Sequence, residues 1–178
     1  METDDFQMKI GDSAIDFNLP AAEGGSNQLA DFPGEVLVIV FMCNHCPYVI
    51  AYLERIKALQ TEFGGRLDVI GINPNDDQSH PQDSYESMID LKKEKFINFA
   101  YLRDESQEIA KAYGALVTPH FYVFDKDRKL QYQGGFDDHM DDHENPDAVI
   151  KDAVNSLLNG EEVKVKTSPV NGCSVKWK

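Results

Sequence analysis

The pattern of apolar residues alternates between strand-like runs and helix-like spacing in the first half of the chain. An unbroken β-branched and aromatic run from Glu35 to Met42 is typical of a strand buried on both faces. After Pro47, apolar side chains recur at helical spacing until Gly64-Gly65 ends the predicted helix. The run Leu67–Ile72 predicts the next strand. The pattern therefore predicts a β–α–β unit whose first strand is central.

Turn-rich segments separate the other predicted elements. Short alternating apolar positions between Gly11 and Leu29 indicate a pair of strands before the central one. The later predicted elements are a helix at about Asp83–Lys93, a strand at Phe96–Leu102, a helix at Glu105–Tyr113 ended by Gly114, a hairpin of Phe121–Phe124 with Leu130–Gln133, and a last helix from Asn145-Pro146 to Gly160. This order predicts an α/β fold with a mixed central sheet flanked by helices. Because no linker or repeat divides the chain, we expect one domain over residues 1–178.

Charge and composition exclude several classes of function. The chain of 178 residues carries 17 Lys and Arg against 31 Asp and Glu, a net charge of −14. Nucleic acids and anionic membranes attract positive surfaces, so we expect neither as a partner. No apolar run approaches the roughly 20 residues of a membrane span, and Met1–Gln7 lacks the basic start of a secretory signal. These features predict a cytoplasmic location.

Two of the three cysteines, Cys43 and Cys46, follow the central strand where the chain enters the predicted helix. Residues three apart on a helix share a face, so the two sulfurs can meet and switch between dithiol and disulfide. The positive end of a helix dipole lowers a thiol pKa from about 8.5 toward neutrality. We therefore expect Cys43 to be the attacking thiolate and Cys46, one turn inside the helix, to resolve the mixed disulfide.

His45 and the cysteine pair each have an alternative interpretation. A charged His45 would stabilise the thiolate and make the disulfide a stronger oxidant, whereas a solvated His45 would have no electrostatic role. The cysteines could instead be an inert buried pair or half of a zinc site. The second CxxC or HxxxH motif that would complete a zinc site is absent from the sequence. The residues favour redox chemistry without a cofactor or a metal.

Five segments spread over most of the chain carry a family resemblance. They are GDSAIDFNLP at 11–20, LADFPG at 29–34, FMCNHCPYV at 41–49, VTPH followed by FYVFD at 117–125, and GCSVKW at 172–177. Together they resemble the thioredoxin superfamily and, more closely, its redoxin branch of alkyl-hydroperoxide-reductase and thiol-specific-antioxidant proteins. The closest similarity is to peroxiredoxin-like proteins that share the CNHCPYV motif. The resemblance implies a thioredoxin-like fold with an N-terminal β-hairpin extension and a C-terminal tail.

The resemblance also assigns roles to Thr118 and Pro119. In the superfamily a proline before the third sheet strand is cis, faces the cysteines, and lies beside backbone groups that pair with an extended substrate. Pro119 is therefore expected to be cis, although cis bonds are uncommon even before proline. The backbone of Thr118 is expected to bind a partner peptide by strand addition, and His120 to begin the next strand.

The sequence departs from both better-known patterns of the superfamily. Cys46 falls at the peroxidatic position of the peroxiredoxin signature, but Cys43 replaces its threonine and Ile39 its proline. The buried aspartate of thioredoxins has no counterpart within Glu35–Met42. We therefore expect a thiol–disulfide oxidoreductase acting on protein or small-molecule disulfides and dithiols. The alternatives are an antioxidant thiol peroxidase that reduces hydroperoxides through a sulfenic acid, and a non-catalytic redox-sensing or metal-binding adaptor.

Two further features lie near the C-terminus. Cys173 belongs to a tail with the only tryptophan, Trp177, so we expect the tail to pack against the fold. Beside the site, Cys173 would be a third redox thiol that resolves or relays the disulfide; elsewhere it would be a small buried residue. The acidic segment Asp137–Glu144 indicates a solvated loop rather than a cation site, since no ligand spacing is evident. We expect a monomer or a weak homodimer.

Overall fold

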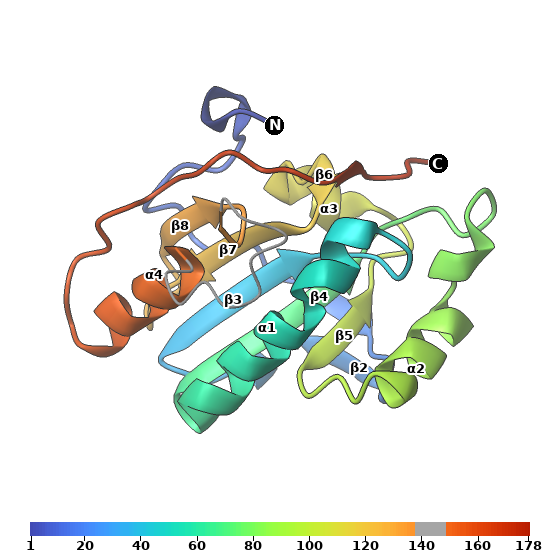
Figure 1. Ribbon diagram of the computed structural model, residues 1–178, viewed down its shortest axis with the longest axis horizontal. Helices are drawn as coiled ribbons and strands as arrows, with labels where there is room; N and C mark the ends of the chain where they lie inside the picture. Colours follow the sequence, from blue (N-terminus) through green and yellow to red (C-terminus); the bar gives the residue numbers. More distant parts are fainter. Residues whose placement is uncertain (138–148) are drawn as a thin grey trace.

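A computed structural model, which describes residues 1–137 and 149–178, has a five-stranded mixed sheet at its centre (Figure 1). The strands, in spatial order, are β5 (Ala100–Arg103), β4 (Leu67–Asn73), β3 (Val36–Phe41), β7 (His120–Phe124) and β8 (Leu130–Gly134). β3, β4 and β5 are parallel, and β7 is antiparallel to both β3 and β8. The predicted β–α–β unit, the closing hairpin and the mixed sheet are confirmed.

The central position of β3 follows from its sequence. All six of its residues are buried, as the unbroken apolar run predicts. Because side chains alternate along a strand, Val36, Val38 and Val40 pack into one hydrophobic core, whereas Leu37, Ile39 and Phe41 pack into a second core on the other face. β3 therefore contributes side chains to both hydrophobic cores. Its C-terminal end determines where the cysteine motif begins.

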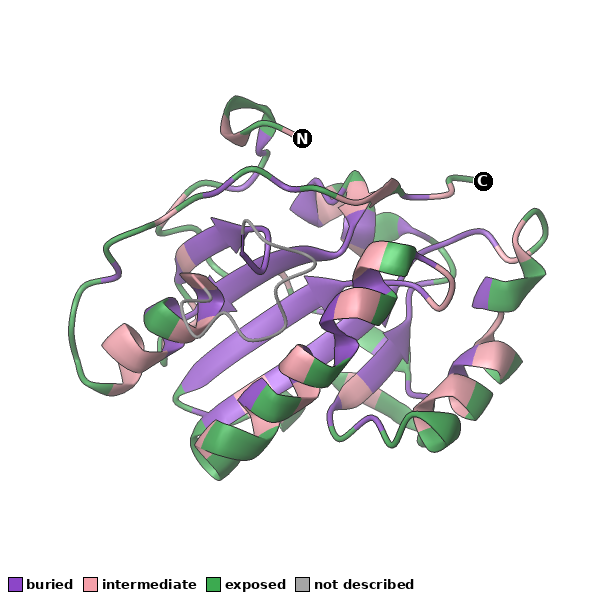
Figure 2. Ribbon diagram, viewed as in Figure 1, coloured by how far each residue is buried: buried purple, intermediate pink, exposed green. Residues whose placement is uncertain are grey.

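Helices cover both faces of the sheet, and Figure 2 shows buried strands beneath helices with exposed outer sides. The helices are α1 (Pro47–Phe63), α2 (Tyr85–Glu94), α3 (Glu108–Tyr113) and α4 (Val149–Leu158). Side chains of α1, α2 and α4 enter the core that contains Val38, and those of α3 enter the core that contains Ile39. No helix in the described parts of the chain combines the length and apolar character needed to cross a membrane.

Two predicted boundaries are wrong, and the predicted start of the last helix cannot be compared. The strand predicted from Phe96 begins only at Ala100. Phe96 has a φ of 50°, and the Ile97 N–H donates to the Lys92 carbonyl, so this segment is the C-terminal turn of α2. The helix predicted from Glu105 begins at 108. The predicted Asn145-Pro146 helix start lies outside the described residues, as does 138–144 of the acidic segment.

Short elements complete the fold. β1 (Asn18–Pro20) and β2 (Ser26–Gln28) form the predicted antiparallel pair. Short 3-10 helices lie at η1 (Thr3–Asp5), η2 (Leu29–Asp31), η3 (Gly64–Arg66) and η4 (Pro81–Asp83). β6 (Val117–Thr118) pairs with β9 (Cys173–Ser174) of the C-terminal tail. The tail crosses the same end of the molecule as α3 and the start of α1 (Figure 1), and it therefore reaches the end of the sheet where the cysteine motif lies.

Candidate active site

Cys43 and Cys46 both precede α1 rather than lying within it. Cys43 follows the end of β3, and Cys46 is the N-cap residue of the helix, which begins at Pro47. Proline suits the first helical position because the N–H it lacks has no partner there. The expectation that the cysteines share a helix face is therefore wrong. The turn nevertheless brings both thiols to Thr118. Both are free thiols.

The electrostatics assign the negative charge to Cys46. Its pKa is lowered to about 4, chiefly by the hydrogen bond from Cys43 and further by those from Cys173 and the Val49 backbone, although burial opposes the shift. The pKa of Cys43 is raised, because its proton is held by Cys46, its sulfur is buried, and Asp83 is near. The direction of these shifts is opposite to the one expected from the sequence, because Cys46 occupies the helix terminus.

Thr118 and Pro119 face these sulfurs, as the resemblance implies. The Thr118–Pro119 peptide bond is cis. The Cys46 sulfur lies 3.2 Å from the Thr118 carbonyl oxygen, and the Cys43 sulfur lies 3.5 Å from its hydroxyl oxygen. His120 begins β7, as expected. The cis-proline loop therefore forms one wall of the site.

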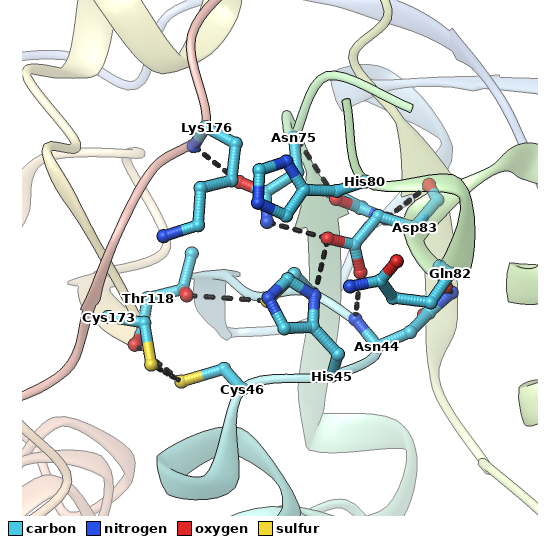
Figure 3. A network of polar contacts seen from close by, with 12 residues as sticks. Asn44, His45, Cys46, Asn75, His80, Gln82, Asp83, Thr118, Cys173 and Lys176 are labelled. Atoms are coloured by element: carbon cyan, nitrogen blue, oxygen red, sulfur yellow. Dashed lines mark hydrogen bonds and ion pairs between the residues drawn. The ribbon is translucent and has the colours of Figure 1, made fainter. Parts of the chain in front are cut away.

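Cys173 lies against the same sulfur from the other side. Its Sγ is 2.9 Å from Sγ of Cys46, and Figure 3 shows the two sulfurs pointing toward one another. The pKa of Cys173 is raised to about 11 by burial and by its hydrogen bond to Cys46. Of the two positions considered for Cys173, the structure places it beside the site. Three thiols and Thr118 thus converge on one point.

A buried carboxylate that the sequence did not reveal holds the cysteine loop in place. Asp83, at the end of η4, is fully buried and accepts hydrogen bonds from the Asn44 backbone N–H and from Asn75 Nδ2, each 2.8 Å long. Its Oδ2 lies 2.7 Å from His45 Nδ1, and the His45 ring stacks on His80 (Figure 3). His45 is therefore anchored by a carboxylate rather than simply solvated.

Cys43, His45 and Asp83 offer donor atoms that lie within 4.8 Å of one another, so a metal site must be considered. Two ligands of tetrahedral zinc, each about 2.0 Å from the ion, lie roughly 3.3 Å apart. The His45–Asp83 separation of 2.7 Å is shorter and is that of a direct contact between the two side chains. The Asp83 oxygens are also already occupied by Asn44 and Asn75. The arrangement therefore favours a polar support for the loop over a metal centre.

Comparisons with known proteins agree with this geometry. The model of the AhpC/TSA family matches residues 10–133. The thiol-disulfide oxidoreductase ResA of Bacillus thuringiensis subsp. konkukian is 27% identical over 131 residues, which cover 72% of this chain and 70% of that protein.

Solved structures extend the likeness over nearly the whole chain. A hypothetical protein from Sinorhizobium meliloti is 36% identical, with a TM-score of 0.89, and the match covers 97% of this chain and 96% of that one. A conserved protein from Geobacillus kaustophilus is 37% identical, with a TM-score of 0.90 and coverage of 97% and 95%. Peroxidoxin BcpB from Mycobacterium tuberculosis, at 20% identity, shares the fold with a TM-score of 0.66 over 86% of this chain and 98% of that one. The predicted thioredoxin-like fold is confirmed.

Proposed function

The chain belongs to the AhpC/TSA family, and we propose that it is a thiol–disulfide oxidoreductase that works through Cys46 and Cys43. The observation that carries the proposal is the meeting of thiols at the start of α1, where the Cys46 sulfur lies 2.9 Å from that of Cys173 and the pKa of Cys46 is lowered. The name of the curated relative, thiol-disulfide oxidoreductase ResA, supports the same class of reaction. The cis-Pro119 loop beside the sulfur supports it further. The predicted membership of the redoxin branch is confirmed.

The thiolate and its neighbour can carry out a complete exchange. The Cys46 thiolate attacks one sulfur of a substrate disulfide, forms a mixed disulfide and releases the first substrate thiolate. Cys43 then loses its proton and attacks the Cys46 sulfur, which releases the second substrate thiolate and forms the Cys43–Cys46 disulfide. The substrate gains two electrons and the protein loses two. These roles reverse those expected from the sequence.

Asp83 and His45 are placed to influence the second step. Cys43 must lose its proton before it can attack, and donor atoms of His45 and Asp83 lie within 4.8 Å of its sulfur. The charge of Asp83 raises the pKa of Cys43 and so keeps this thiol protonated while Cys46 carries the negative charge. We infer that the pair accepts the Cys43 proton during resolution, a task that a buried aspartate performs in the thioredoxins that this fold resembles.

The test is dithiothreitol-dependent turnover of a disulfide substrate by four proteins. Wild type is expected to turn over, and Cys46→Ser to lose the activity because no stabilised thiolate remains. Cys43→Ser is expected to slow the turnover, because the thiol that resolves the mixed disulfide at Cys46 is lost. Ser156→Ala, on α4, is a control substitution outside the cysteine site and is expected to keep the wild-type turnover. Undiminished turnover by Cys46→Ser would contradict the proposal.

Hydroperoxide reduction is the second candidate. It is favoured by the low pKa of Cys46, because a thiolate attacks the peroxide oxygen and becomes a sulfenic acid, which a neighbouring thiol converts to a disulfide and water. The Cys46 contacts described above are thiols and backbone groups, and none of them is the arginine that polarises the peroxide in peroxiredoxins. Consumption of hydrogen peroxide that is lost in Cys46→Ser would support this activity, and no consumption by wild type would exclude it.

A further inference from the structure

The place where a substrate strand is expected to bind is occupied by the protein's own C-terminal tail. β9 pairs antiparallel with β6, the strand that ends at the cis-proline bond, and Cys173 lies opposite Thr118. An extended peptide that added to Thr118 would have to use these same backbone groups. The tail therefore takes the position of a bound substrate and presents a thiol at the position of the reacting sulfur.

The tail is fastened on both sides of Cys173, so the pairing is not a loose contact. Val175 donates its N–H to the Leu116 carbonyl over 2.9 Å, and Lys176 donates its N–H to Asn75 Oδ1 over 2.9 Å. Before Cys173, a Cβ at Gly172 would lie only 2.2 Å from the Thr118 carbonyl oxygen, a distance that no side chain tolerates. The glycine at this position is what allows the tail to approach so closely.

The tail also determines which sulfur can be reached from solvent. Cys43 and Cys46 are 0% exposed, whereas Cys173 is only partly buried. With the tail in place, a partner thiol or disulfide meets Cys173 first. Cys46, which carries the negative charge, lies directly behind it at 2.9 Å.

We propose that Cys173 is a third redox thiol, which forms a disulfide with Cys46 and exchanges it with external dithiols. The inference rests on the proposed thiol–disulfide exchange at Cys46 and adds the residue through which substrate electrons enter. The partner is a dithiol, on a protein or a small molecule, whose first thiolate reaches the sulfur of Cys173.

The Cys46–Cys173 disulfide forms when Cys173 loses its proton and attacks Cys46 in the Cys43–Cys46 disulfide, which releases Cys43, so the disulfide substrate of the proposed function is the oxidant. The exchange with a dithiol then balances in electrons and protons. A substrate thiolate attacks Sγ of Cys173, so that a substrate–Cys173 bond forms, the Cys46–Cys173 bond breaks, and the electron pair leaves on Cys46. Because a thiol of low pKa is the better leaving group, the cleavage favours this direction. The second substrate thiolate then attacks the substrate sulfur of the mixed disulfide and releases Cys173, which takes up a proton. The substrate loses two electrons as its disulfide forms, and the protein gains two.

Peptide mapping of the oxidised protein tests the disulfide. After oxidation with diamide, acid quenching and alkylation, trypsin releases Ile10–Arg55 with both motif cysteines and Thr167–Lys176 with Cys173. We expect these two peptides to be joined in wild type and in Cys43→Ser, and to be separate in Cys46→Ser. An internal disulfide within Ile10–Arg55 together with alkylated Cys173 would overturn the proposal, as would a cross-link that survives in Cys46→Ser.

Rates of dithiol oxidation separate this inference from the proposed function. Cys173→Ser is expected to oxidise reduced dithiothreitol at least about tenfold more slowly than wild type, because the partly exposed entry thiol is lost. Ser174→Ala, the next residue of β9, is the matched control and is expected to keep the wild-type rate. If Cys173→Ser is as fast as wild type while Cys46→Ser is inactive, only the role of Cys173 fails. If Cys46→Ser remains active, the proposed function fails as well.

Discussion

Sγ of Cys46 and Sγ of Cys173 lie 2.9 Å apart, although 127 positions separate the two residues in the chain. Two geometric features bring them together: the N-cap position of Cys46 on α1 and the pairing of β9 with the strand before Pro119. Hydrogen bonding with Cys43 and Cys173 lowers the pKa of Cys46. The proposed function depends on this cluster of three sulfurs and on the lowered pKa of Cys46 within it.

The charge on Cys46 leads to a direct prediction about its titration. In the reduced protein, thiolate absorbance in the ultraviolet should rise with a midpoint near the pKa of about 4 expected for Cys46. Cys43→Ala should raise that midpoint, because it removes the largest stabilising hydrogen bond to the thiolate. Cys46→Ser should abolish the acidic transition. A transition of the wild type near the ordinary thiol value would contradict the assignment.

The second prediction concerns Asp83, whose charge raises the pKa of Cys43. Asp83→Asn keeps the size of the side chain but removes the negative charge that raises the pKa of Cys43. The pKa of Cys43 should therefore fall, and the rate of mixed-disulfide resolution should reach its plateau at lower pH than in wild type. Stopped-flow measurement of the resolving step across the pH range checks this.

The control for Asp83 is the same chemical change on an exposed side chain. Asp90→Asn removes one charge from an exposed side chain on α2 and should leave the pH profile unchanged. A purely structural role for Asp83 would lower the amplitude of the reaction without moving the profile along the pH axis. Such a result would contradict the proposed influence on Cys43.

The third prediction tests the closeness of the tail. Gly172→Ala places a methyl group against the Thr118 carbonyl, so β9 should leave β6. Trp177, which is 37% exposed and lies 5.6 Å from the Lys111 ammonium, is the chain's only tryptophan and reports on the tail. Its emission should shift to longer wavelength, and iodoacetamide should alkylate Cys46 faster because its cover is gone.

Gly65→Ala is the matched control for the tail variant. A Cβ at Gly65 meets nothing within 4 Å, and the residue is not in the left-handed region. This variant should keep the wild-type emission and the wild-type rate of alkylation. Equal alkylation rates in Gly172→Ala and Gly65→Ala would show that the tail does not cover Cys46.

Part of this site could be predicted from the sequence because it depends on local patterns. The apolar run of β3 and the cysteines after it are contiguous, and Pro47 is itself a signal for a helix start that makes Cys46 the N-cap. Reading the helix as beginning before Cys46 caused the reversed assignment of the thiolate. The expected cis geometry of Pro119 came from the family resemblance and is confirmed.

The remainder depends on contacts between distant parts of the chain. Asp83 follows a turn-rich loop, at the place where the sequence predicts the first residue of a helix. Nothing in that segment indicates hydrogen bonds to Asn44 and Asn75. The pairing of Cys173 with Thr118 likewise joins two strands, and 55 positions separate the two residues in the chain. The GCSVKW motif contributes to the resemblance seen in the sequence, but only the fold shows which sulfur the tail meets.

The last prediction concerns the acid stability of the fold, through His120 at the start of β7. This side chain is 1% exposed and stacks on Tyr122 with ring centroids 4.4 Å apart. Burial, with a smaller contribution from the ammonium group of Met1, lowers its pKa to about 3. An unfolded chain binds a proton at His120 below about pH 6.5, whereas the folded chain does not, so stability must fall as the pH drops from 6.5 toward 3.

His120→Phe removes this titration while keeping an aromatic ring against Tyr122, whose hydroxyl still donates to the Tyr113 carbonyl. Between pH 7 and pH 5, wild type should lose about 2 kcal/mol more unfolding free energy than the variant, measured by urea denaturation. Other titrating groups, including Cys46, change both proteins alike, so the difference isolates His120. Parallel pH dependence of the two proteins would mean that His120 is protonated in the folded state, and that its burial does not hold it neutral.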